Sequence, residues 1–242
     1  MKIWAHRGCS LRYPENTLTS FKKACEIKGL AGIELDVQYT SDGRIVVIHD
    51  ETVDRTTDGH GFVRDYTLAE LKKLNIKYGD NAPEHIPTLD EVLDLITPNL
   101  KAGMKLNIEL KTSIYPYIGI EEETVNMIKE RGLESSIVWS SFSALSLPIV
   151  RKLLPDADIG MLSERASDCL RIHMAGVGSN AIHPYGNAID TDLAKYPQMP
   201  VRAWFLGHLY PSAPTGTKFD FSKYEKLGVT DVFLNEPEVY LN

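Results

Sequence analysis

Two hydrophobic periodicities alternate along most of this 242-residue chain. Short apolar runs of the kind that form buried strands are followed by segments whose apolar side chains recur every three or four residues, which is typical of amphipathic helices. After a first apolar run at 2–5, a helix is predicted to begin at a capping residue, Asn16 or Thr17, and to end at Gly29. Further helices are predicted over residues 67–74, 88–96, 121–131, 144–154, 166–175, 190–196 and 221–227.

The predicted strands interleave with these helices in a way that favours one fold class. Strand beginnings are predicted at Lys2, Gly32, Met104, Ser136, Asp158, Asn180, Val201 and Asp231. A strand that is followed by a helix and then by another strand pairs in parallel, with a right-handed crossover. Eight such units in about 250 residues are typical of a TIM (β/α)8 barrel. We therefore predict one α/β domain over residues 1–242.

The second strand is predicted to turn back on itself as a hairpin on the barrel rim. The Asp-Gly pair at 42–43 lies between two runs of β-forming residues, which is the strongest short-range signal for a two-residue hairpin loop. Such a loop places Asp36 opposite His49. Because side chains alternate between the two faces of a strand, Glu34, Asp36 and His49 then project on the same side.

Residues 51–86 interrupt the regular pattern directly after this hairpin. The first half of the segment is rich in Thr, Asp, Gly, His and Arg, and the whole is too long for an ordinary connection. Long insertions on such folds form lids or binding loops. We expect this one to close the pocket or to make a subunit contact, and the sequence leaves the oligomeric state open.

Composition and charge narrow the class of protein. A formal net charge of −7 and a pI near 5.5 argue against nucleic acid as the main partner, but they allow a small phosphate-bearing substrate. The three cysteines form no C-x-x-C pair, which argues against a disulfide framework or a zinc–cysteine site. No apolar run reaches the length of a membrane span, and no signal peptide precedes the first strand. We therefore expect a cytoplasmic protein without stable membrane insertion.

The predicted strand ends carry the candidate metal site. In TIM barrels the reactive residues lie at the carboxyl ends of the strands and in the loops that follow. Here those positions include Glu34, Asp36 and Glu109. At an effective dielectric constant of ~20, two carboxylates ~4 Å apart repel each other by roughly 4 kcal/mol, so the group needs a counter-cation. An all-oxygen ligand set favours Mg²⁺ or Ca²⁺ over zinc or copper.

Two histidines and two basic residues are expected beside this metal site. His6 ends the first strand and His49 ends the hairpin. Because imidazole titrates near neutral pH, the two can act as an acid and base pair. Arg7 and Lys111 supply positive charge for an anion such as a phosphate. The set predicts metal-assisted cleavage of a phosphodiester.

These residues fall within a series of short motifs that resembles a known family. In chain order the motifs are His6-Arg7-Gly8, Pro14-Glu15-Asn16-Thr17, Glu34-Leu35-Asp36-Val37, Asp42-Gly43, Val46-Val47-Ile48-His49-Asp50, Arg55-Thr56-Thr57-Asp58-Gly59, Ile86-Pro87-Thr88-Leu89, Ile108-Glu109-Leu110-Lys111 and Ser141-Phe142. In this order the chain resembles the glycerophosphodiester phosphodiesterases over essentially its whole length. Several motifs in the right order are far more specific than any single one.

The resemblance implies a TIM barrel that hydrolyses a glycerophosphodiester to glycerol 3-phosphate and an alcohol with Mg²⁺ or Ca²⁺. It assigns the metal to the three carboxylates Glu34, Asp36 and Glu109, and acid–base catalysis to His6 and His49. It assigns phosphate contact to Arg7 and Lys111. Glu15, Phe142 and Trp204 are further candidate substrate-binding residues, and Trp204 is either a packing residue or a wall for the glycerol group. Two questions stay open: which histidine is the acid, and whether water or a neighbouring substrate hydroxyl attacks the phosphorus.

Two segments near the C-terminus depart from the family pattern. Many members follow the late Trp with Thr-x-Asn and close with Thr-Asp before a Pro. This chain has the segment 205–207 after Trp204, and Leu234-Asn235 before Pro237. The departures leave the preferred head group undetermined.

Three alternative functions remain at this stage. The first is phospholipase-D-like cleavage of lysophospholipids, although such toxins are secreted and disulfide-bonded. The second is a catalytically inactive barrel that binds glycerophosphate, although none of the five catalytic and metal-binding residues is missing. The third is a hydrolase of another TIM-barrel family, which zinc in the purified protein would favour.

Overall fold

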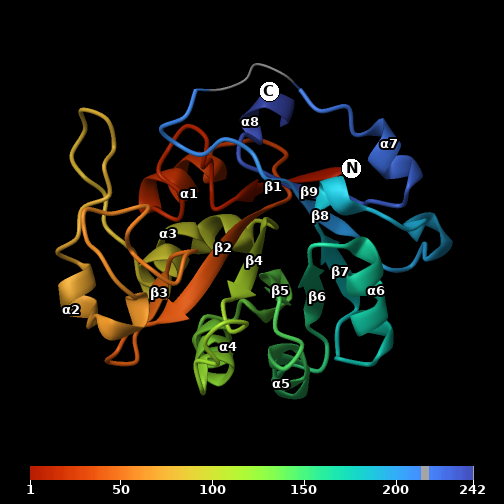
Figure 1. Ribbon diagram of the computed structural model, residues 1–242, viewed down its shortest axis with the longest axis horizontal. Coiled ribbons are helices and arrows are strands. Elements are labelled where there is room, and N and C mark those ends of the chain that lie inside the picture. Colours follow the sequence, from red (N-terminus) through yellow and green to blue (C-terminus); the bar gives the residue numbers. More distant parts are fainter. Residues whose placement is uncertain (214–217, 242) are drawn as a thin grey trace.

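The computed structural model describes residues 1–213 and 218–241, which fold around a barrel of parallel strands (Figure 1). The strands are β1 (Lys2–His6), β2 (Gly32–Tyr39), β4 (Lys105–Leu110), β5 (Ile137–Ser141), β6 (Asp158–Ser163), β7 (Ala181–Pro184), β8 (Arg202–Trp204) and β9 (Asp231–Leu234), with β3 (Ile45–Val47) antiparallel to β2 outside the ring. Their order is β7-β6-β5-β4-β2-β1-β9-β8, and parallel bridges from Ile182 to Val201 and from Tyr185 to Trp204 join the two ends. The predicted TIM barrel is confirmed, and each predicted strand begins within one residue of the observed one.

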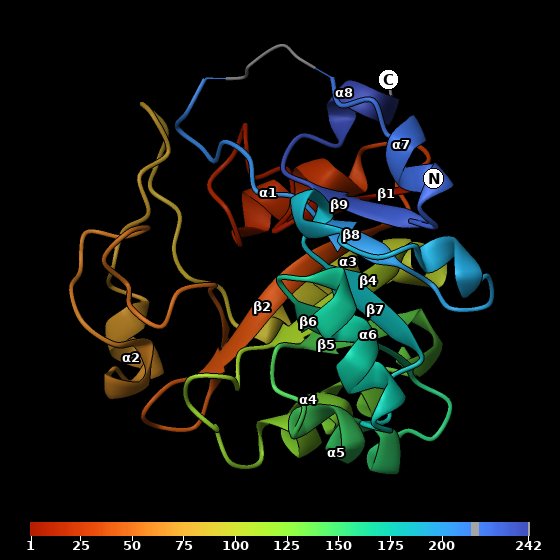
Figure 2. The same ribbon diagram turned by 45° about the vertical axis from the view of Figure 1, so that its right-hand side comes forward.

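Helices cover the outside of the barrel (Figures 1 and 2). They are α1 (Leu18–Cys25), α3 (Leu89–Lys101), α4 (Ile120–Glu130), α5 (Ser146–Leu153), α6 (Ala166–Met174), α7 (Ser222–Lys226) and α8 (Glu238–Leu241). The short helix α2 (Leu68–Leu71) lies apart from them, in the segment after the hairpin, and 3-10 turns form at Val63–Asp65, Glu134–Ser136, Gly186–Ala188 and Leu193–Lys195. Along β2, Ile33, Leu35 and Val37 join the buried apolar cluster that includes side chains of α1 and α3. Glu34 and Asp36 alternate with them, so β2 has an apolar outer face and a charged inner face.

Some helix predictions differ from the structure. Within the predicted helix 190–196 only one 3-10 turn forms, and Pro197 explains this because it disfavours a helical backbone at Tyr196. The helix predicted over 67–74 is the shorter α2, whereas α3 extends past its predicted end at Ile96. Ile96 and Leu100 are both buried, so packing maintains the last turn of α3 although Pro98 lies within it.

The hairpin exists, but its register differs from the prediction by one residue. Three residues, 41–43, form the loop in place of two. Gly43 has a φ of +70°, the left-handed conformation that a three-residue hairpin loop requires. The N–H of Ile48 donates to the carbonyl of Asp36 (3.1 Å), so the predicted position of His49 opposite Asp36 is wrong.

The residues that follow the hairpin lie beside the barrel, next to β2 and β3 (Figure 1). They fold over a small apolar core separate from the main one, formed by Val46, Ile48, Val53, Val63, Leu71, Ile76 and Ile86. This core attaches the segment to the β3 strand. In the described part of the chain, no helix is both long and apolar enough to cross a membrane.

Candidate active site at the mouth of the barrel

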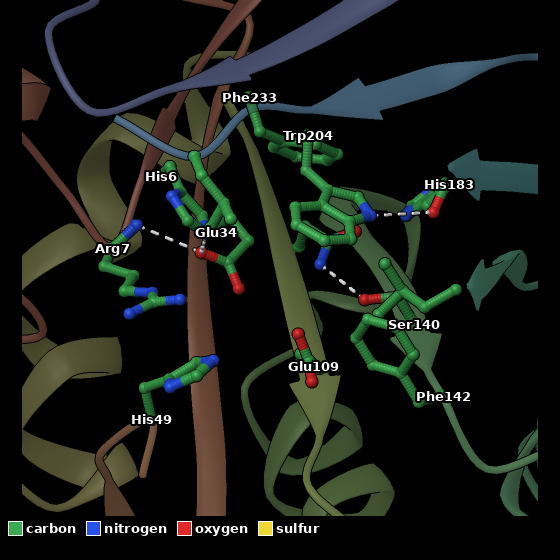
Figure 3. A pocket seen from close by; sticks show the side chains of 13 residues that line it. His6, Arg7, Glu34, His49, Glu109, Ser140, Phe142, His183, Trp204 and Phe233 are labelled. Atoms are coloured by element: carbon green, nitrogen blue, oxygen red, sulfur yellow. Dashed lines mark hydrogen bonds and ion pairs between the residues drawn. The ribbon is translucent and has the colours of Figure 1, made fainter. Parts of the chain in front are cut away.

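Residues at the carboxyl ends of β1, β2 and β4 meet at one cavity of about 200 Å³, to which His49, Phe142 and Trp204 are added from other parts of the chain (Figure 3). His6 is the register partner of Glu34, and Asp36 is the register partner of Glu109. The cavity is lined by His6, Arg7, Glu34, His49, Asn107, Glu109, Ser140, Phe142, Leu162, His183, Trp204, Leu206 and Phe233. Seven of the ten predicted site residues therefore line it. Of the other three, Asp36 and Glu15 pair with Arg7, and Lys111 pairs with Glu109.

Glu34, Asp36 and Glu109 form a compact triad of buried carboxylates. Each can offer one oxygen such that the three oxygens lie within 4.8 Å of one another. Among the described residues, the Oδ1 atom of Asp36 has no hydrogen-bond partner. Burial and the neighbouring carboxylates raise the pKa of Glu34 well above its ordinary value, and burial raises the pKa of Glu109. A cluster of oxygen donors that is short of positive charge fits a hard divalent cation.

Two buried basic side chains face this triad. Lys111 Nζ lies 3.0 Å from Glu109 Oε1 and 3.9 Å from Asp36 Oδ1. Arg7 Nε lies 3.7 Å from Asp36 Oδ2, and the Arg7 backbone N–H donates to Glu34 Oε2 at 3.0 Å. Arg7 holds a φ of 58°, a backbone conformation that non-glycine residues rarely adopt outside functional sites. Burial acts to raise the pKa of Asp36, but the surrounding positive charges outweigh it and lower that pKa.

The hydrogen bonds of His6 determine which ring nitrogen carries its proton. The amide of Asn235 donates from Nδ2 to the carbonyl of His208 (3.1 Å), so its Oδ1 is the atom that lies 2.7 Å from His6 Nδ1. An amide oxygen only accepts, so Nδ1 is protonated and Nε2, which lies 3.9 Å from Glu34 Oε2, has the lone pair. Burial and the charge of Arg7 lower the pKa of His6 to about 3, so the ring is neutral at pH 7.

His49 reaches the cavity by a bend and not by strand alternation. The β3 strand ends at Val47, and the side chain of Gln38 then donates from Nε2 to the carbonyls of Ile48, His49 and Asp50 at 3.0, 3.2 and 2.8 Å. The two N–H groups of this amide are shared among the three carbonyls, which holds the bend in place. His49 Nδ1 lies 2.7 Å from Asp50 Oδ1, and since a carboxylate accepts, His49 Nδ1 carries a proton as well.

Glu15 lies behind Arg7. Its Oε1 accepts from Arg7 NH1 at 2.9 Å, and its two oxygens accept from Arg55 at 2.6 and 2.9 Å. Burial acts to raise the pKa of Glu15, but the hydrogen bonds and charges of Arg55 and Arg7 lower it. The structure thus makes Glu15 a partner of two arginines, and it does not line the cavity.

The wall opposite the charged residues is aromatic and comes from the other half of the barrel (Figure 3). Phe142 and Trp204 meet edge to face with ring centroids 6.1 Å apart, and Tyr185 stacks on Trp204 at 4.7 Å. The Trp204 Nε1–H donates to the carbonyl of His183 (3.2 Å). The indole is therefore held by two ring neighbours and one hydrogen bond.

Several lining residues were not predicted. Leu162, His183 and Phe233 enter the cavity from β6, β7 and β9, and Leu206 follows β8. Alternation along these strands could have identified the inward positions, but it gives no sign that an apolar side chain forms a pocket wall. Asn235 and Gln38 were not predicted as partners of the histidines, because each bond depends on tertiary structure.

Comparisons with known proteins agree with this geometry. A family model described as the glycerophosphoryl diester phosphodiesterase family matches residues 6–210. A glycerophosphodiester phosphodiesterase of Caldanaerobacter subterraneus subsp. tengcongensis is 43% identical over 250 residues, covering 99% of this chain and 96% of the relative. One from Bacillus subtilis is 33% identical, covering 98% and 84%. The structure of an Oleispira antarctica phosphodiesterase in complex with its product sn-glycerol-3-phosphate matches with a TM-score of 0.74 at 29% identity, covering 99% of this chain and 94% of that one.

Proposed function

The chain belongs to the glycerophosphoryl diester phosphodiesterase family and is a phosphoric diester hydrolase. We propose that it hydrolyses a glycerophosphodiester to glycerol 3-phosphate and an alcohol, with Mg²⁺ or Ca²⁺ as the metal ion. The observation that carries the proposal is the meeting of three buried carboxylates, two histidines and two basic side chains at one cavity. The product complex of the Oleispira antarctica relative, which contains sn-glycerol-3-phosphate, supports the choice of product.

Glu34, Asp36 and Glu109 are the proposed ligands of the divalent cation, and the unpartnered Asp36 oxygen supports this assignment. When bound, such a cation orients substrate oxygens and stabilises negative charge that develops on them. The chain itself compensates phosphate charge with Arg7 and Lys111, both of which lie against the triad.

The two histidines have different partners, which supports different roles. His6 has an unprotonated Nε2 because its Nδ1 donates to a neutral amide, so His6 takes the proton of the attacking oxygen. That oxygen belongs either to water or to a neighbouring substrate hydroxyl, and the second route passes through a cyclic phosphate that water then hydrolyses to glycerol 3-phosphate. The Nδ1 of His49 donates to the carboxylate of Asp50, a bond that orients the ring. His49 then gives the proton on its Nε2 to the oxygen of the departing alcohol.

The remaining predicted residues have supporting roles in this proposal. Phe142 and Trp204 form an apolar wall for the carbon-bearing groups of the substrate. Glu15 supports phosphate binding indirectly, because it holds the guanidinium of Arg7.

The experiment that tests this proposal is release of glycerol 3-phosphate from glycerophosphocholine and glycerophosphoethanolamine. We expect release that stops in EDTA and resumes when Mg²⁺ or Ca²⁺ is restored. Glu109→Gln should lose cation-dependent activity, whereas Glu122→Gln, on the exposed surface of α4, should keep it. If a metal-loaded protein releases nothing from either substrate, the proposal is wrong. Cleavage of a choline lysophospholipid by that same protein would then indicate the lipid-cleaving alternative.

A further inference from the structure

One arginine of the segment after the hairpin joins two separate parts of the site. Arg55 makes four hydrogen bonds to carboxylates: two to Glu15 at 2.6 and 2.9 Å, and two to Asp50 at 2.6 and 3.0 Å. Glu15 also binds Arg7, and Asp50 also binds His49. We propose that Arg55 is a positioning residue that fixes His49 as proton donor and Arg7 as phosphate ligand in one arrangement; this inference rests on the roles proposed above.

The first arm of this network runs through Asp50 to His49. Arg55 Nε donates to Asp50 Oδ2 at 2.6 Å, and Asp50 Oδ1 accepts from both Arg55 NH2 (3.0 Å) and His49 Nδ1 (2.7 Å). The side chains of His49 and Asp50 are 31% and 27% exposed, so packing alone does not fix their rotamers. Without Arg55, the carboxylate of Asp50 can rotate and the imidazole of His49 can follow it.

The second arm runs through Glu15 to Arg7. The side chain of Glu15 is only 6% exposed, so its negative charge requires close partners. Arg55 supplies two hydrogen bonds to this carboxylate, and Arg7 supplies one. Because Arg55 compensates much of the negative charge of Glu15, Glu15 does not fully neutralise Arg7. The positive charge of Arg7 can therefore also attract Asp36 and an incoming phosphate.

A guanidinium is suited to this task, whereas an ammonium is not. Its N–H groups form a rigid planar fork, so one side chain can engage two carboxylates from two directions at once. Three different nitrogens of Arg55 are used here. Lysine retains the charge but presents one nitrogen, so it cannot reproduce both arms.

Arg55 could instead be an ordinary surface ion pair, since its side chain is 43% exposed and such pairs contribute little stability. Two observations argue for the positioning role. Both of its partners directly contact residues of the cavity. Val53, two residues before it, is fully buried in the small core beside β3, so the backbone presents Arg55 from a packed position.

The test compares two leaving groups in an Arg55→Lys variant. Glycerophosphocholine releases an alkoxide that needs a proton, whereas the p-nitrophenyl ester of glycerol 3-phosphate releases a phenolate that leaves without one. Loss of an orienting partner of this kind costs roughly 10- to 100-fold in activity. With Arg55→Lys we expect kcat for glycerophosphocholine to fall by that amount, and kcat for the p-nitrophenyl ester to fall by less than about threefold. KM should rise for both substrates, because Arg7 is no longer held in its position.

Two companion variants make the outcome decisive. Arg64→Lys is the matched control, because Arg64 lies exposed in the same segment against Tyr115 and should leave both substrates unaffected. Equal loss of kcat on the two substrates with Arg55→Lys, or no loss on either, would overturn the positioning role. The His49→Ala variant tests the acid role of His49 separately from the positioning role of Arg55. If its loss of kcat is the same for the two substrates, the acid role of His49 is wrong.

Discussion

The two walls of the cavity are built by different physical means. The charged wall consists of His6, Arg7, Glu34, His49 and Glu109, from β1, β2, β4 and the hairpin. The aromatic wall consists of Phe142, Leu162, Trp204, Leu206 and Phe233, from the strands β5, β6, β8 and β9 and the loops after them. Figure 3 shows most of the two sets on opposite sides of the cavity. Ion pairs and hydrogen bonds position the first wall, and ring packing positions the second.

This difference indicates how the two walls tolerate change. Removing one partner of a buried ion pair leaves an uncompensated charge and costs about 3–5 kcal/mol. An aromatic pair contributes about 0.5–1.5 kcal/mol beyond its buried area, and a neighbouring side chain can partly replace a lost ring. We therefore expect the proposed chemistry to depend on the charged wall, and the choice of substrate groups to vary with the aromatic wall.

The largest effect is expected from the histidines of the charged wall. His6→Ala and His49→Ala should each lower turnover of glycerophosphocholine by about 10²- to 10⁴-fold, because each removes one of the two groups that we propose transfer protons. The variants should keep their thermal unfolding temperature within a few degrees. His60→Ala is the control, since its side chain is 86% exposed. Turnover close to that of the unaltered protein in either variant would contradict the assigned role.

The basic side chains should show how far the charged wall depends on charge balance. Lys111→Met removes the cation that lies 3.0 Å from Glu109, so the free energy of unfolding in EDTA should fall by about 3 kcal/mol. Added Ca²⁺ or Mg²⁺ should restore part of this loss, because in our proposal the ion binds to the same carboxylates and supplies positive charge. Urea unfolding with and without the ion measures both effects, and exposed Lys101→Met should show neither. Equal stability of the two variants in EDTA would argue against charge compensation by Lys111.

A milder change is expected from the aromatic wall. Phe142→Ala should raise KM about tenfold and leave kcat within about threefold, because it removes contact area that ground state and transition state share. Steady-state kinetics with glycerophosphocholine and glycerophosphoethanolamine provide the measurement. Leu145→Ala, on the same loop but 78% exposed, is the matched control. A large fall in kcat would mean that the two walls do not divide their tasks in this way.

The smallest effect is a pH dependence of stability that arises from Glu15. Burial acts to raise its pKa, but the bonds to Arg55 and Arg7 lower it below the ordinary value of 4.5. A carboxyl group with a lowered folded-state pKa stabilises fully above its unfolded pKa, and this stability is lost as the pH falls through the folded-state pKa. Below about pH 4.5, the free energy of unfolding of the unaltered protein should therefore fall more steeply with decreasing pH than that of the Glu15→Gln variant. The two slopes should differ by at most about 1.4 kcal/mol per pH unit.

Urea unfolding at several pH values from about 5.5 downward measures this slope. Exposed Glu130→Gln, at the end of α4, should keep the steeper slope. If the unaltered protein and the Glu15→Gln variant show the same slope, the ion pairs of Glu15 do not lower its pKa.

The alternation of side chains between the two faces of a strand allowed much of this site to be predicted from the sequence. It predicts that Glu34 and Asp36 share the inner face of β2, and the same rule gives Glu109 on β4. Alternation is a local property of any extended backbone, so it needs no knowledge of the partner strands. The same rule failed for His49, because one extra loop residue changes the parity of the whole return strand.

The sequence by itself therefore determined the eight-unit barrel, the inward carboxylates and the family to which the chain belongs. Only the tertiary structure decided how the histidines are held and protonated. Asn235 meets His6 across 229 positions of the chain, and Arg55 meets Glu15 across 40. Such bonds depend on the closed barrel and on the packing of the segment beside β3, since no local periodicity specifies the distance between groups so far apart in the chain.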